Sequence, residues 1–470
     1  MSAIAPPTPA PRRPLERFLC LFAEVRDGEG LQLVLLALNV FLILTAYYVM
    51  KPVREALILA QPGGAEIKSY AYAAQAGLFV VLVPLYSLLA TRLPRRRLIN
   101  VVTALFIACL PAFYMLAENK APIGFVFFLW IGIFSLMVIA QFWSYANDVY
   151  SPEAGKRLFA VIAFGGSAGA VFGSWIASAL IRTLGVNPLL LVATSILATS
   201  LLLFNFIDLR ERSAAGRARG GATDPGAAQR QRDVSIGDGE AFGLLKRNRY
   251  LLLIALITLF LNWVNSAGEY ILSAVVKHEA DLAVATGSIL LSEQRLFIGT
   301  FFADYFHIVN LAGMLLQLFV VSRAIKYLGV PIALCILPVV ALASYTVAAL
   351  IPSLMILRWV KIAENSVDYS LMNTVRQLLF LPTRRNEKYK AKQLIDCLVV
   401  RGGDVLSAAT VYLGTAVLSL SISQFAWINV AVVSVWLVLA MATGREFQQR
   451  VATHERRSRD RVPEAAVVRP

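Results

Sequence analysis

Long apolar runs separated by short polar stretches dominate this chain. The first, Leu31 to Met50, is twenty residues long and carries no charge. An α-helix needs about 20 mostly apolar residues to cross the hydrocarbon core of a bilayer. The pattern therefore predicts twelve membrane spans, at about 31–50, 69–90, 98–117, 122–146, 158–182, 186–207, 249–275, 304–325, 330–351, 354–374, 394–418 and 422–442.

The composition supports this interpretation. Of the 470 residues, 58% are hydrophobic and only 16% are charged, whereas a soluble protein carries about 25% charged residues. We therefore expect an all-α polytopic membrane protein. The four cysteines are scattered without the spacing of metal ligands, so neither a metal site nor a disulfide framework is predicted.

The net charge of +15 is concentrated in alternate loops. Basic residues lie at Arg95–Arg97 after the second span, at 156–157 after the fourth and at 384–392 after the tenth. Because such loops face the cytoplasm, both termini are expected there. This distribution indicates a lipid bilayer, and not nucleic acid, as the partner. It carries no information on the oligomeric state.

Between the sixth and seventh spans the chain loses almost all its large apolar residues. Residues 208–248 are predicted to be a flexible cytoplasmic linker. They separate a six-helix bundle at 31–207 from a second at 249–442, with tails at 1–30 and 443–470. Glycine pairs at Gly165 and at Gly402 follow basic clusters at matching places in both halves. Two such pseudo-symmetric halves with a substrate between them resemble the major facilitator architecture.

Charged residues at the end of the first run are the leading candidates for function. Lys51, Arg54 and Glu55 follow directly after Met50. A charge at membrane depth costs about 2.5–3.5 kcal/mol and is tolerated mainly where it faces a cavity or a partner. This favours a transporter whose substrate touches these groups. Alternatively, Lys51 and Arg54 cap the helix at the interface and extend to water.

The tenth span carries further charges. Lys361, Glu364 and Asp368 share one helix face, where Lys361 and Glu364 can pair. The face serves either to neutralise charge internally or to contact substrate. No phosphate-binding GxxxxGK[ST] loop and no nucleophile with its base occur in the sequence, so neither an enzyme nor a cofactor is predicted.

Three segments carry a family resemblance. They are YVMKPVREALILAQPGGAEIKSY from Tyr48, FWSYANDVYSPEAGKRLFAVIAFGGSAGAVFG from Phe142 and NWVNSAGEYILSAVVK from Asn262. They resemble the bacterial and plastid ATP/ADP translocases. The resemblance implies a transporter of the bacterial cytoplasmic (inner) membrane that exchanges or imports nucleotides by alternating access.

The same resemblance implies roles for single residues. Lys51 is similar to the family's essential lysine, Glu269 to its glutamate in the seventh span, and Arg376 to a late basic residue. The family's acidic residue in the fourth span has no match here. Transport of another organic or phosphorylated anion, with or without a proton, stays open. So does a scaffold or sensor that has lost transport.

A nucleotide needs three kinds of partner. Its phosphates need cations, for which the candidates are Lys51, Arg54 and Arg376. Its base and ribose need rings and amides, for which the candidates are Tyr48, Trp143, Tyr270, Asn147 and Asn265. We expect Glu269 to pair with Lys51 or Arg54 until substrate displaces it, or to carry a proton. Asp368 is the second candidate for such coupling. A fixed structural salt bridge of Glu269 is the alternative.

Overall fold

The computed structural model describes residues 29–218, 247–383 and 391–459 except 393, together with residues 16, 19, 20, 24–26 and 243. Every regular element in these ranges is helical, as predicted. In chain order the elements are α2 (Gly30–Leu59), α3 (Gly64–Arg92), α4 (Arg95–Glu118), α5 (Gly124–Val149), α6 (Pro152–Leu184), α7 (Leu189–Ala218), α9 (Arg249–Ala285), η2 (Leu291–Glu293), α10 (Gln294–Phe319), α11 (Val321–Leu350), α12 (Leu354–Val367), η3 (Asp368–Met372), α13 (Asn373–Leu378), η4 (Ile395–Val399), α15 (Val400–Tyr412), η5 (Leu413–Val417) and α16 (Ile422–Arg459).

Ten helices in the described ranges are long and apolar enough to cross a membrane. The predicted tenth and eleventh spans instead consist of shorter pieces, α12–η3–α13 and η4–α15–η5. In both, π-helical turns interrupt the α-helix. Such turns are rare in proteins, and those that occur are often at functional sites. Together these twelve segments follow the predicted order, so the predicted fold class is confirmed.

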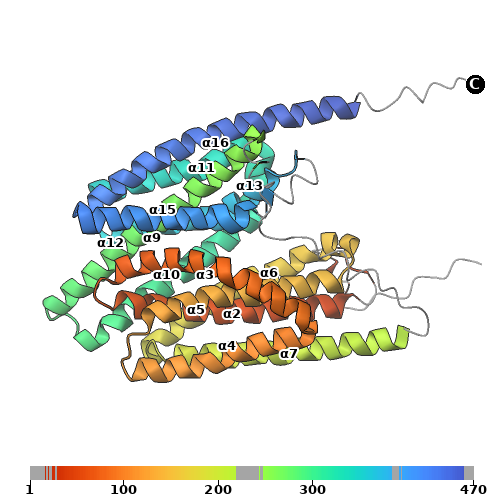
Figure 1. Cartoon of the computed structure of the whole chain (residues 1–470), viewed down its shortest axis with the longest axis horizontal. Coiled ribbons are helices and arrows are strands. Elements are labelled where there is room, and N and C mark those ends of the chain that lie inside the picture. The colour runs from red at the N-terminus through yellow and green to blue at the C-terminus, as the bar shows by residue number, and fades with distance from the viewer. Residues whose placement is uncertain are drawn as a thin grey trace, which may run out of the picture.

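The helices bury two hydrophobic cores. One core is built almost wholly from α2–α7, which we call lobe one, and the other mainly from α9–α16, which we call lobe two. Lobe one lies below lobe two in the view of Figure 1, and α7 and α16 both end toward the right of the picture. We call the end where α7 stops and α9 starts the linker end, and the opposite end the far end.

Glycines bring α6 into backbone contact with α2. A Cβ atom at Gly165, Gly169 or Gly173 would lie 2.3–2.6 Å from a carbonyl oxygen of α2, closer than any side chain can approach. In lobe two, a Cβ atom at Gly403 of α15 would lie 2.8 Å from the carbonyl oxygen of Leu259 in α9. The two halves therefore use the same device at matching places, with small residues at a close helix crossing.

Polar contacts between the lobes lie in the middle of the helices and toward the far end. Among the described residues, every hydrogen bond and ion pair between lobe one and lobe two joins positions 66–68 or 170–182 to positions 269–273 or 304–310. These are the last part of α6, the start of α3 and the facing parts of α9 and α10. The lobes are thus fastened together away from the linker end.

Several predicted boundaries were wrong. α2 continues nine residues past Met50 to Leu59, and α10 covers Gln294–Phe319 where 304–325 was predicted. The charged and polar residues at these places face the inside of the protein, so they do not end the helices. α7 extends into the predicted linker as far as Ala218, and α16 extends into the predicted tail. Residues 219–242 of that linker and the basic positions 384–390 lie outside the described residues.

Candidate functional site

Lys51 lies inside α2 rather than at its end. Its side chain is buried, as are those of Arg54 and Glu55 in the next turn. A residue that capped the helix at the membrane surface would extend into water. The burial of Lys51 and Arg54 therefore excludes the interfacial interpretation of these two residues.

Aromatic rings surround the Lys51 ammonium. The nitrogen lies 4.4 Å from the ring centre of Phe306, 5.0 Å from Tyr48, 5.8 Å from Tyr369 and 6.0 Å from Tyr47. Two of these rings belong to α2 of lobe one, and two to α10 and η3 of lobe two. We call Lys51 and these four rings the aromatic cage. Attraction of a cation to a ring contributes about 0.5–2 kcal/mol, less than a desolvated ammonium loses.

One turn farther along α2, the charges neutralise each other. The Arg54 guanidinium donates to the Glu55 carboxylate and packs over the ring of Phe128 at 4.5 Å. The other oxygen of Glu55 lies 2.8 Å from the ammonium of Lys68 in α3. Arg54 thus already has a carboxylate partner.

Lys68 links the lobes. Its ammonium lies 3.3 Å from the Glu269 carboxylate and donates to the Ser273 hydroxyl at 2.8 Å. Asn365 of α12 donates to the other oxygen of Glu269 at 3.2 Å. The expected partners of Glu269 were Lys51 or Arg54, and this expectation was wrong. The sequence analysis missed Lys68, which stands in the segment GAEIKSY just before the predicted second span at 69–90.

A second buried group lies behind Asn365. Lys361 and Glu364 pair at 3.1 Å, as their spacing predicted, and both contact the hydroxyl of Tyr345 in α11. Asn365 also donates to the hydroxyl of Tyr305 at 2.7 Å. This helix face is therefore a connected network of polar groups, which reaches Glu269 through Asn365.

The π-helical turn η3 begins at Asp368 and carries Tyr369 of the aromatic cage. Asp368 is half-buried, and within the described ranges no cation lies within 4.0 Å of its carboxylate. Tyr369 is 39% exposed, whereas Lys51 is 8% exposed. The accessible surface of the aromatic cage is therefore on the Tyr369 side.

Comparison with known proteins identifies the family of this chain. The Major Facilitator Superfamily profile matches residues 31–385 of the chain. The chain belongs to the Major Facilitator Superfamily. Membership together with the apolar helices identifies an integral membrane protein of the transporter class and not an enzyme. No curated protein sequence matches the chain.

Solved transporters share the fold. A bacterial homologue of the human lysosomal transporter Spinster, inward-facing and unoccupied, is 15% identical with a TM-score of 0.57, covering 91% of this chain and 99% of its own. The nucleoside transporter NupG is 15% identical with a TM-score of 0.59, covering 89% and 98%. The human organic anion transporter MFSD10 is 16% identical with a TM-score of 0.51, covering 90% and 100%. At these identities the similarity concerns the fold alone.

In this superfamily member, two further predicted residues lie near the lobe boundary. Tyr270 follows Glu269, packs edge-on against Phe425 at 5.0 Å and donates to Glu66 of α3 at 3.4 Å. Asn265 lies one helical turn before Glu269 and therefore shares its face of α9. The ring and hydroxyl of Tyr270 are both engaged in these contacts, whereas Asn265 is half-buried.

Three other predicted residues lie away from the aromatic cage. Trp143 packs against Phe142 and Phe159 inside lobe one. Asn147 is exposed near the linker end of α5. Arg376 of α13 pairs with Asp396 at 3.4 Å, seven residues past Tyr369 and so roughly 10 Å along the segment. The structure does not bring these three residues together with Lys51.

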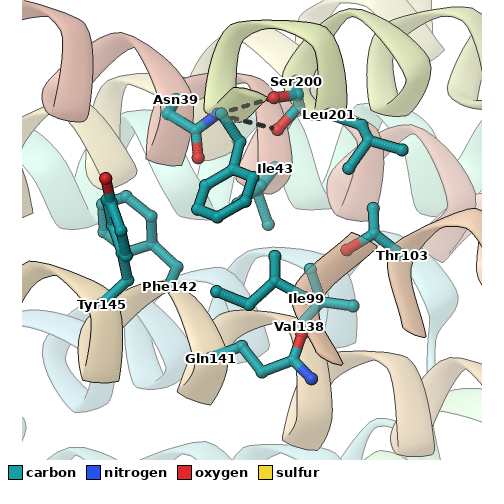
Figure 2. Close-up of a pocket in the computed structure, with 11 residues that line it drawn as sticks. Asn39, Ile43, Ile99, Thr103, Val138, Gln141, Phe142, Tyr145, Ser200 and Leu201 are labelled. Carbon is teal, nitrogen blue, oxygen red and sulfur yellow. Dashed lines mark hydrogen bonds between the residues drawn. The ribbon is translucent and has the colours of Figure 1, made fainter. Parts of the chain in front are cut away.

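A small pocket lies inside lobe one (Figure 2), and no residue of the aromatic cage is among those that line it. It lies between α2, α4, α5 and α7 and is lined by Asn39, Ile43, Ile99, Thr103, Val138, Gln141, Phe142, Tyr145, Ser200, Leu201 and Phe204. Asn39 donates to the Ser200 carbonyl oxygen at 2.8 Å. Because the lining residues belong to one lobe, the pocket does not span the boundary at which major facilitator substrates bind.

Proposed function

We propose that this protein transports a small organic anion across the membrane by alternating access of its two lobes. One observation carries the proposal. Lys51 has a buried ammonium whose neighbours are rings from both lobes. A buried cation without an anionic partner is unfavourable by several kcal/mol, and an incoming anion removes that penalty.

Nucleotides are the substrate class that the sequence resemblance favours. The planar base of a nucleotide fits an aromatic surrounding, and its phosphate fits an ammonium. Lys51 and Glu269 are the two residues of the resemblance that lie near the lobe boundary. We therefore take Lys51, Tyr48 and the rings of Phe306 and Tyr369 as the proposed substrate contacts. Glu269 is proposed to hold the lobes together through Lys68.

Orientation follows from the basic loops. If both termini lie on the cytoplasmic side of a bacterial inner membrane, the far end faces away from the cytoplasm. The inter-lobe contacts of Lys68, Glu269 and Asp304 then close the outer side. In this proposal the described conformation is one in which substrate exchanges with the cytoplasm.

The test uses purified protein in lipid vesicles. Labelled ATP, ADP and other organic anions are offered outside, with the same unlabelled compound inside. We expect counterflow for at least one anion, and Lys51→Gln should lower its rate about tenfold or more, as for loss of one buried charge contact. Lys277→Gln is the matched control, because Lys277 is also on a spanning helix but pairs with Asp281 at 2.7 Å. Counterflow of no anion, or equal rates in Lys51→Gln and wild type, would refute the proposal.

A further inference from the structure

The charges around the aromatic cage come in pairs, with one cation left over. Arg54 and Lys68 face Glu55 and Glu269, while Lys361 faces Glu364. Lys51 is the remaining cation. Within the described ranges no carboxylate lies within 4.0 Å of its ammonium.

The more distant cations either pair with a carboxylate or lie far from Lys51. The pairs Arg182–Asp304, Arg376–Asp396 and Arg401–Asp404 lie within ion-pair distance. Arg358 packs on the rings of Phe301 and Trp359, eleven residues before Tyr369 and so roughly 16 Å along the segment. These cations therefore add no free positive charge beside Lys51.

Acidic groups near the aromatic cage further reduce the positive charge that is available to a ligand there. Asp368 precedes Tyr369 directly, and Glu66 accepts a hydrogen bond from Tyr270. A ligand that opened the existing pairs would gain cations but leave Glu55, Glu269 or Glu364 buried without partners. The net charge available to a ligand stays the same whichever pairs it breaks, and a surplus of buried negative charge is strongly unfavourable.

We propose that the substrate carries a single negative charge, a carboxylate or a phosphodiester, attached to a planar or apolar body. This inference deepens the proposed transport function and rests on it. Lys51 neutralises the one charge, and the four rings of the aromatic cage contact the body. Nucleoside diphosphates and triphosphates exceed the capacity of the site.

A series of ligands with one base and stepwise charge tests the inference. Adenosine, 3′,5′-cyclic AMP, AMP, ADP and ATP carry zero, one, about two, about three and about four negative charges near neutral pH. Nicotinate and benzoate supply single carboxylates without ribose. Binding to the full-length protein is measured by thermal shift and by equilibrium dialysis at constant ionic strength.

We expect the tightest binding for singly charged ligands, with cyclic AMP, nicotinate or benzoate binding at least about tenfold more tightly than ATP. Lys51→Gln should remove this advantage and leave adenosine binding unchanged, with Lys277→Gln as control. Tighter binding of ATP or ADP than of every singly charged ligand would overturn the inference and leave the proposed anion transport standing. Failure of every anion to bind would instead end both.

Discussion

The ammonium of Lys68 lies 3.3 Å from the carboxylate of Glu269, and this ion pair joins α3 of one lobe to α9 of the other. Lys68 also contacts Glu55 at 2.8 Å, so Glu269 is connected through it to the charges of α2. The pair is one of the contacts that join the lobes away from the linker end. In the proposed alternating-access cycle, it has to break before the far end can open.

Glu269→Gln tests this contact without leaving Lys68 unpartnered, because Glu55 and Ser273 remain. Removing an interaction of about 1–3 kcal/mol changes the ratio of two conformations by about 5-fold to 150-fold. We expect the far end to open more often. The measurement is the distance between spin labels at residues 119 and 288, which are exposed in the loops at the far end of each lobe, after replacing the four native cysteines.

Asp281→Asn is the control for this variant. It removes the pair with Lys277 within α9 and touches no contact between the lobes. Its distance distribution should match that of the parent protein. If Glu269→Gln also leaves the distribution unchanged, the pair does not fasten the lobes.

Neighbouring glycines of α6 offer a matched test of helix packing. In Gly165→Ala the new Cβ atom meets the Ala37 carbonyl oxygen at 2.6 Å, whereas in Gly166→Ala the nearest atom is a Val40 methyl at 3.7 Å. Overpacking of this kind typically costs about 1–3 kcal/mol. We expect a lower melting temperature in detergent for Gly165→Ala only. Equal melting of the two variants would contradict the close α2–α6 contact.

We propose that Asp368, rather than Glu269, is the residue that couples proton movement to transport. Glu269 is held by Lys68 and Asn365, while the Asp368 carboxylate has no cation within ion-pair distance in the part of the chain described. A carboxylate without a fixed partner can gain and lose a proton during transport. Asp368→Asn should abolish any acceleration of uptake by external acid, and Glu269→Gln should retain it. Uptake rates compared at mildly acidic and neutral pH decide the matter, and the reverse pattern would assign the proton to Glu269.

The sequence was sufficient for the fold class, because long uncharged runs are a local pattern. The charge beside the first run drew attention to Lys51, whose role in binding stays a prediction. The sequence pattern failed where a helix carried charges inside. Residues 51–59 were placed after the first span, yet they continue α2, since Arg54 and Glu55 pair with each other and Lys51 is enclosed by rings instead of facing lipid. Local pattern alone carries no information on such pairing.

Partner choice was the second limit. Glu269 was expected beside Lys51 or Arg54, because these were the cations singled out next to the first span and Lys68 was not considered. Arg54 is instead satisfied by Glu55, its direct neighbour, and Glu269 by Lys68. Distances between α3 and α9 depend on how the lobes dock, which no periodicity of the chain reveals. Asn147 and Trp143 were included for their chemistry, and the fold places them elsewhere.

Gly165, Gly169 and Gly173 of α6 lie against the backbone of three successive turns of α2. Rotation or sliding of α2 alone would therefore disrupt this contact, so we expect α2 and α6 to move together. Tyr47 and Tyr48 accompany the ammonium wherever lobe one goes, while Phe306 and Tyr369 stay behind with lobe two. Each separation of the lobes would therefore remove two of the four rings from around Lys51, and they would return when the lobes come together again. In the proposed cycle, the substrate would be bound while rings of both lobes face Lys51 and released when the lobes move apart, without a change in the shape of either lobe.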